Sequence, residues 1–187
     1  MQVLDMDFMV FMESKAGGEA IDVLWRGTRF EWLRKLPAKR KGELGELLVA
    51  AIFNGRIVSG VRYDVEAGEM KIEVKLATQS VVKIVTRKFT WNQVRHSDSS
   101  THHCLIAVYP ANIRAFNIPT EIIRLNISRQ HGEGDGSFNA TNLDYHKVYT
   151  GEKWVYMKDF EIINSAQQVP KREPPQVSVP DPTDADP

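Results

Sequence analysis

A short charged segment carries residue types suited to metal-assisted chemistry. Asp64 precedes Glu66-Ala67-Gly68, and the stretch Lys71–Leu76 then alternates charged and aliphatic residues. Side chains two positions apart on a strand share a face, so we expect Glu73 and Lys75 to point the same way. The intervening link is short enough for a hairpin, which would return Asp64 to their side. Two carboxylates and an ammonium on one face predict a divalent-metal site beside a positive charge, which suits a phosphodiester substrate.

A purely structural strand fits the same letters. An antiparallel strand with one solvated face also reads Lys-Ile-Glu-Val-Lys-Leu, and its charges then pair with those of a neighbouring strand in water. The segment upstream favours the catalytic interpretation, because it supplies a further carboxylate in an apolar setting.

The residues from about 41 to 53 are expected to form a helix, since Leu, Ala and Ile recur at helical spacing and Asn54-Gly55 follows as a stop signal. The predicted buried stripe consists of Leu44, Leu47, Leu48 and Ala51. Glu46 falls within this apolar run, next to Gly45, whose missing side chain lets another backbone come close. A carboxylate at that position is costly unless it meets a cation or a metal-bound water.

Two other interpretations of the helix carboxylates are open. Glu46 could be structural and pair with Arg40 or Lys41 in the first turn. Glu43 could take the catalytic role instead, although an acidic residue near a helix start is also favoured by the helix dipole.

Together these residues resemble the PD-(D/E)xK nuclease superfamily, especially its restriction-endonuclease-like members. The order is a helix with Glu46, a strand with Asp64 and a strand with Glu73-x-Lys75, and Tyr63 stands where the superfamily's name has a proline. The likeness also covers segments 76–78, 89–95, 104–110 and 118–123.

The resemblance implies an α/β restriction-endonuclease-like core, with a mixed central sheet of four to five strands flanked by helices. The residue pattern itself predicts strands near 57–65, 69–76, 80–86, 104–109 and 153–157, short helices near 30–34 and 118–125, and a loop over 131–137. We expect residues 37–165 to form the nuclease core and residues 1–36 to pack on it as an extension. The Pro-rich tail, 166–187, is expected to be disordered.

The proposed site would bind Mg²⁺, with Mn²⁺ as a substitute. Asp64, Glu73 and the carbonyl of Val74 are the predicted ligands, because oxygen ligands suit this ion. Lys75 would orient the attacking water and stabilise the charge that develops on the phosphate. Glu46 would accept a hydrogen bond from a metal-bound water or support a second ion. The resemblance further implies a product with a 5′-phosphate.

Residues after the lysine strand complete the predicted site. In similar nucleases a polar residue on this element supports the scissile phosphate, and Gln93 is the candidate here, although Gln93 and Arg95 could equally flank a turn. A basic surface for the DNA backbone is predicted from Lys83, Arg87, Lys88, Arg95 and His96. A strand edge protected by lysines would look the same.

Composition limits the classes of protein that fit. The chain has 187 residues, which suggests one domain, and its 24 basic and 24 acidic residues give no overall field for a passive DNA coat. A single cysteine excludes an internal disulfide and suits a reducing compartment. The N-terminus does not read as a signal peptide, and no apolar run reaches the ~18 residues of a membrane span, so we expect a cytoplasmic protein.

These observations predict a metal-dependent endonuclease that hydrolyses double-stranded DNA, either of restriction type or related to phage and mobile-element nucleases. Such enzymes commonly dimerise so that two sites cut two strands, which makes a homodimer the expected assembly. One alternative is a junction-resolving or repair nuclease with the same core. Another is a DNA-binding or interaction module that keeps the fold without catalysis.

Overall fold

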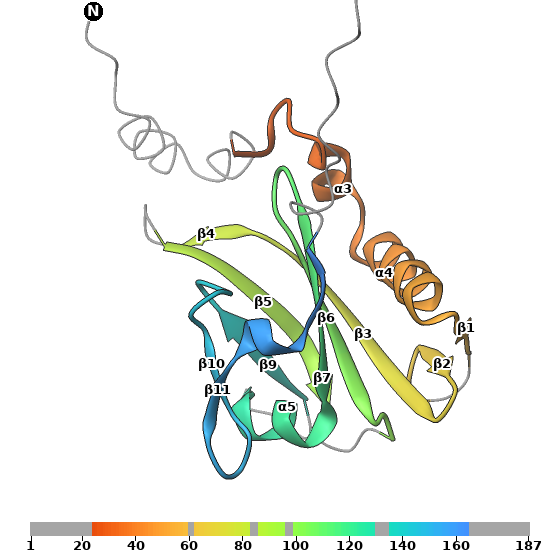
Figure 1. Cartoon of the computed structure of the whole chain (residues 1–187). Coiled ribbons are helices and arrows are strands. Elements are labelled where there is room, and N and C mark those ends of the chain that lie inside the picture. Colours follow the sequence, from red (N-terminus) through yellow and green to blue (C-terminus); the bar gives the residue numbers. More distant parts are fainter. Residues whose placement is uncertain (1–23, 60–61, 83–85, 96–98, 130–134, 165–187) are drawn as a thin grey trace, which may run out of the picture.

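A six-stranded mixed sheet forms the centre of the computed structural model, which describes residues 24–59, 62–82, 86–95, 99–129 and 135–164 (Figure 1). Its strands follow the order β1-β2-β3-β6-β7-β12, in which β3 and β6 are parallel and the remaining neighbours are antiparallel. The strands are β1 (Arg56–Ile57), β2 (Val65–Ala67), β3 (Met70–Thr78), β6 (His102–Val108), β7 (Ile113–Pro119) and β12 (Glu161–Asn164). The expected mixed α/β sheet is therefore present, with six strands instead of four or five.

One face of this sheet is covered by α3 (Glu31–Lys35) and α4 (Ala38–Phe53), as Figure 1 shows. α4 ends as predicted, because Asn54 adopts the left-handed conformation with φ +49° and caps the last turn. Gly45 faces the sheet so closely that an added Cβ would lie 3.2 Å from Cγ1 of Val74. The buried stripe therefore includes Gly45 and Val49. The prediction was wrong for two of its four residues. Leu47 lies roughly 200° around the helix from Gly45 and is 56% exposed, and Ala51 is exposed too.

A second sheet covers the opposite face, where the resemblance implied helices. It has four strands in the order β4-β5-β9-β8. They are β4 (Ser80–Val82), β5 (Thr86–Arg95), β9 (Asp135–Ala140) and β8 (Ser128–Arg129). Phe89 and Trp91 of β5 pack with Phe138 of β9 against Leu105 and Phe116 of the central sheet. The connection from β3 to its parallel neighbour β6 thus runs through strands, and this face is covered mainly by a sheet, although Ile122 and Ile123 of the helix after β7 also pack here.

The remaining elements close the far end of the core. α5 (Thr120–Asn126) follows β7 directly, as predicted. A hairpin of β10 (Lys147–Tyr149) and β11 (Trp154–Tyr156) leads through the 3-10 helix η1 (Met157–Phe160) into β12. Asn126 fastens the hairpin to α5, because its side chain accepts from the Tyr149 N–H and donates to the Tyr149 carbonyl, both at 2.8 Å.

Several sequence predictions need correction. The single strand expected over 57–65 is two short strands, because the chain turns back after Ile57 and β1 pairs with β2. Residues 135–137 are in β9 and not in a loop. β5, β7, β10 and β12 were not predicted. The N-terminal residues 1–23, the tail from 165 and residues 83–85 lie outside the described ranges, so the proposed domain division stays a prediction.

The described part of the N-terminal segment packs on the sheet. Trp25, Phe30 and Leu33 are buried in the same apolar cluster as Val49. Trp32, beside Leu33 on α3, is 53% exposed. Within the described ranges, no helix has the length and apolar character needed to cross a bilayer.

Candidate active site

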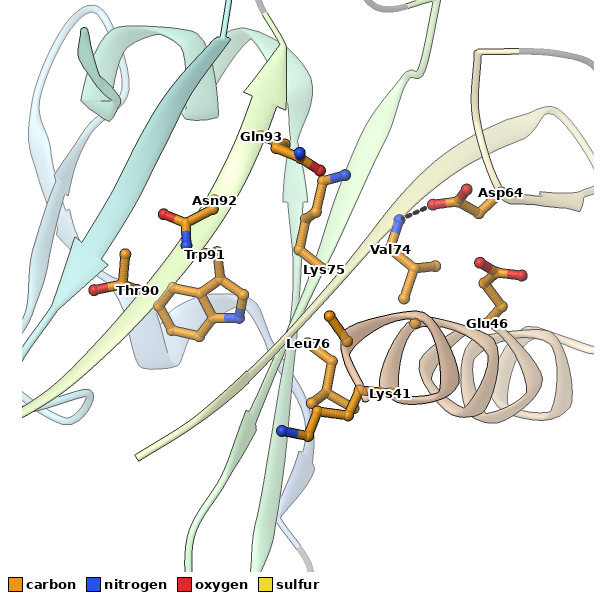
Figure 2. A pocket seen from close by; sticks show the side chains of 12 residues that line it. Lys41, Glu46, Asp64, Val74, Lys75, Leu76, Thr90, Trp91, Asn92 and Gln93 are labelled. Carbon is orange, nitrogen blue, oxygen red and sulfur yellow. Dashed lines mark hydrogen bonds between the residues drawn. The ribbon is translucent and has the colours of Figure 1, made fainter. Parts of the chain in front are cut away.

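The candidate site begins where β2 stops pairing with β3. The last paired residues are Val65 and Ile72, so beyond Ile72 no described strand lies on this edge of β3. Asp64, just before β2, bonds the exposed backbone instead: its Oδ2 accepts from the Val74 N–H at 2.8 Å (Figure 2). The N–H and C=O of one strand residue point to the same edge. The Val74 carbonyl is therefore directed to the side of β3 on which Asp64 lies.

A cavity of about 330 Å³ opens beside this edge, between α4 and β5. It brings together five residues that the sequence predicted for the site, from three elements and one loop: Glu46, Asp64, Val74, Lys75 and Gln93. The other lining residues are Ala38, Lys41, Gly42, Leu76, Thr90, Trp91 and Asn92. Figure 2 shows Glu46 and Asp64 at one end of this space and Lys75 beside Gln93.

Glu46 meets a second carboxylate and not the basic residues of a structural pair. Its pKa is raised by partial burial and next by the negative charge of Asp64, while Lys75 acts in the opposite direction. The two expected structural partners are engaged elsewhere: Arg40 pairs with Glu43 at 2.5 Å, and Lys41 Nζ donates to the carbonyl of Arg34 at 3.0 Å. A carboxylate whose ionisation is disfavoured by burial and by a neighbouring carboxylate is typical of a site that receives a cation.

Glu73 and Lys75 form an ion pair of 2.5 Å between Oε1 and Nζ. The face that carries them does not lie in water, because Glu73 is only 8% exposed. Ala77, the next residue on this face, packs with Phe89 of the second sheet. The alternative of a half-solvated strand with its charges in water is therefore wrong. Lys75 lines the cavity. Glu73 is not among the described lining residues, and its link to the cavity is the ion pair with Lys75.

Gln93 occupies an uncommon backbone conformation. Its φ is +56°, and the register between β5 and β9 shifts between Trp91 and Val94 at a bulge. Positive φ is rare for residues other than glycine, and bulges beside active sites commonly re-aim a side chain. The amide of Gln93 points toward the end of Lys75 in Figure 2. The alternative in which Gln93 and Arg95 flank a turn is wrong, since β5 continues to Arg95.

The predicted DNA-contacting residues are only partly described. Arg87 is exposed and Lys88 is half-buried on β5, and as consecutive strand residues they point to opposite sides. Arg95 ends β5, while Lys83 and His96 lie outside the described residues. A common basic surface of all five residues therefore stays a prediction.

Sequence reasoning did not assign three polar residues of the cavity, Lys41, Thr90 and Asn92. Lys41 lies on the first turns of α4, and its pKa is lowered by burial and then by the charge of Arg34. Asn92 precedes Gln93 in the bulge. The only sequence signal for Lys41 was its place in the basic approach to the helix, which it shares with Lys39 and Arg40.

The donor atoms at the open edge of β3 fit a hard divalent cation. The carboxylates of Glu46 and Asp64 lie at one end of the cavity, beside the edge of β3 to which the Val74 carbonyl points. Mg²⁺ is commonly bound by one or two carboxylates and retains several waters. In the described part of the chain, no three His, Cys, Asp or Glu side chains are grouped closely enough to hold a metal by themselves. A bound ion would thus need backbone oxygen, water or substrate phosphate as further ligands.

Comparison with known proteins assigns no family. No protein-family model matches the chain, and no curated protein matches it. Function is therefore inferred from the residues that surround the open edge of β3.

Proposed function

We propose that the protein is a metal-dependent endonuclease that hydrolyses phosphodiester bonds of double-stranded DNA, of restriction type or related to phage and mobile-element nucleases. The observation that supports this function best is the meeting of Glu46, Asp64, Lys75 and Gln93 at one cavity. These side chains come from α4, from the loop before β2, from β3 and from the bulge of β5. A merely solvated strand would not gather four polar side chains from four parts of the chain.

Each residue has a task in the hydrolysis. When bound, Mg²⁺ would lower the pKa of a coordinated water and neutralise negative charge on the phosphate oxygens. Asp64 is held in one orientation by the Val74 N–H, so its second oxygen keeps a fixed direction. Glu46, whose pKa is raised, is suited to accept a hydrogen bond or proton from the attacking water. The water attacks phosphorus as the bond to the leaving oxygen breaks.

The ammonium of Lys75 stabilises the negative charge that develops on the phosphoryl oxygens. Glu73 holds this ammonium at 2.5 Å, so we assign it the positioning of Lys75 in addition to the ligand role expected from the sequence. Gln93, which lines the cavity from β5, supports the scissile phosphate. A homodimer, with one site for each strand of the duplex, is part of the proposal.

A plasmid-cleavage assay tests this function directly. We expect purified protein to nick and linearise supercoiled plasmid with Mg²⁺ or Mn²⁺ and to lose this activity with EDTA. Lys75→Ala should lower the rate by about 100- to 1000-fold. The matched control is Lys71→Ala, which removes an exposed lysine from the same strand outside the cavity. Equal cutting by Lys75→Ala and the wild type would contradict the proposal.

A further inference from the structure

The hairpin of β10 and β11 buries one face against the core and exposes the other to solvent. Lys147 pairs with Tyr156, and Tyr149 pairs with Trp154. Residues directly opposite each other on antiparallel strands share a face. Val148, which lies between the two pairs, points inward and is fully buried. We call the four residues on the other side, Lys147, Tyr149, Trp154 and Tyr156, the outer hairpin face.

Large aromatic side chains dominate the outer hairpin face. Trp154 is 63% exposed and Tyr156 is 37% exposed. The ring of Tyr149 lies 5.4 Å from that of Trp154, at an angle of 44°. Isolated exposed apolar residues are ordinary, but adjacent exposed aromatic rings on one rigid face are typical of a binding surface.

Ammonium groups accompany these rings. The Nζ atoms of Lys147 and Lys158 lie 5.5 and 5.2 Å from the centre of the Tyr156 ring. Residues 145–158 contain three lysines and one glutamate, whereas the whole chain is neutral. The two neighbouring aspartates are already bound, Asp144 to Arg114 at 2.9 Å and Asp159 to the Tyr156 N–H at 3.1 Å. Asp159 keeps its negative charge, so the hairpin region has a small excess of positive charge, and two of its ammonium groups lie against the ring of Tyr156.

The hairpin is held in place before any partner binds. Asn126 bonds both backbone groups of Tyr149, and at the turn the Thr150 N–H donates to the Lys153 carbonyl at 2.9 Å. Binding would therefore order few additional groups. In Figure 1 the hairpin lies beside α5, away from α4.

We propose that the outer hairpin face binds unpaired nucleotides, with a base stacked on Trp154 and the lysines contacting phosphates. Exposed rings beside lysines complement a strand that offers flat base faces and negative charge. A regular duplex hides its base faces, so unpaired bases are the part of a nucleic acid that can stack on these rings. The proposal rests on the proposed function for the identity of the strand as DNA. It adds that the substrate carries unpaired nucleotides near the duplex that is cut, as flaps, junctions and frayed ends do.

Binding of a fluorescent 20-nucleotide thymidine oligomer, measured by anisotropy with EDTA present, tests this inference apart from cleavage. We expect Trp154→Ala to weaken binding at least about 5-fold, while Trp154→Phe retains most of the affinity. Trp32→Ala is the matched control, because it removes another tryptophan that is half exposed, from α3. Replacing Lys147, Lys153 and Lys158 by glutamine should reduce the slope of log affinity against log salt by about 2.

Two results would overturn the inference. The first is equal oligomer binding by Trp154→Ala and the wild type, with thermal melting showing both folded. The second is a wild-type dimer that Trp154→Ala converts to a monomer with unchanged oligomer binding, because the face would then bind protein. Failure of the nuclease proposal is distinguishable: Trp154-dependent binding without cleavage at any concentration of Mg²⁺ would support this face and reject the endonuclease.

Discussion

Two clusters of charged side chains on the central sheet are built in opposite ways. At the edge formed by β7 and β12, Arg114 donates from Nε and Nη2 to the carboxylate of Glu161 at 2.6 and 2.9 Å, and its Nη1 lies 2.9 Å from Asp144. At the open edge of β3, the carboxylate of Glu46 lies near that of Asp64. We call the first cluster the arginine network and the second the carboxylate pair.

The pKa directions show how the two clusters differ. Burial alone would lower the pKa of Arg114, but hydrogen bonds and charge from Glu161, followed by Asp144, raise it overall. The charged form is thus stabilised by its surroundings. The pKa of Glu46 is raised by burial and then by Asp64, so its charged form is destabilised. An arrangement that disfavours its own ionised state costs stability at neutral pH, and carboxylates with raised pKa values are enriched at functional sites.

The largest expected effect comes from removing one charge of the carboxylate pair. Asp64→Asn should lower the rate of Mg²⁺-dependent plasmid cleavage by about 1000-fold, because a ligand charge is lost. Folding should not suffer, since the amide oxygen of asparagine can still accept from the Val74 N–H and the repulsion on Glu46 is relieved. Cleavage rates and thermal melts measured in parallel check both parts.

The matched control for that variant is Asp144→Asn, which makes the same chemical change in the arginine network, where Asp144 is exposed. Its cleavage rate should equal that of the wild type. A loss of stability in Asp64→Asn as large as its loss of activity would show that the carboxylate pair is structural.

A change of intermediate size is expected in the arginine network. Arg114→Ala leaves Glu161 without its bidentate partner and should lower the free energy of unfolding by about 3 kcal/mol. Urea denaturation measures this loss, and Arg114→Lys should fall between the two because it keeps the charge but not the paired hydrogen bonds. At a temperature where Arg114→Ala is folded, cleavage should be unchanged. A folded but inactive Arg114→Ala would remove the distinction between the two clusters.

The sequence predicted which residues lie near the cavity better than it predicted which of them pair: it placed the carboxylates of Asp64 and Glu73 together, whereas Asp64 lies near Glu46 and Glu73 pairs with Lys75. Alternation along β3 places Glu73 and Lys75 on one side in any strand, and a glycine beside Glu46 indicated close packing of the helix. It could not show that the Glu73 carboxylate turns to Lys75 while Asp64 bonds the Val74 backbone. Those contacts depend on where β2 ends.

β5 shows why a strand cannot always be predicted from a strict alternation of buried and exposed residues. Phe89, Trp91 and Val94 are its buried residues, a spacing of two and then three, because the bulge at Gln93 inserts a residue. A search for strict alternation therefore fails at the position where the side chain enters the cavity. β9 was missed for another reason: Asp135-Gly136-Ser137 is loop-like in composition, and its strand form is imposed by pairing with β5.

The smallest expected effect is a change in how stability depends on pH. Because the folded-state pKa of Glu46 is raised, the folded protein binds more protons than the unfolded chain between the ordinary glutamate pKa and the raised value. The wild type should therefore gain stability as the pH falls through that window and lose it as the pH rises. Glu46→Gln cannot ionise, so its contribution should stay constant and it should be the more stable protein above the window.

Urea denaturation at pH values from about 4 to 8 measures this difference, with the two proteins converging at the acidic end. Glu43→Gln is the control on the same helix. The charge of Glu43 raises the pKa of Glu46 less than burial and Asp64 do, so this variant should keep most of the slope. Adding Mg²⁺ at neutral pH should then stabilise the wild type more than Glu46→Gln, since binding to the folded state alone raises the free energy of unfolding. Identical pH slopes for the wild type and Glu46→Gln would mean that the carboxylate pair does not repel, and the contrast with the arginine network would fail.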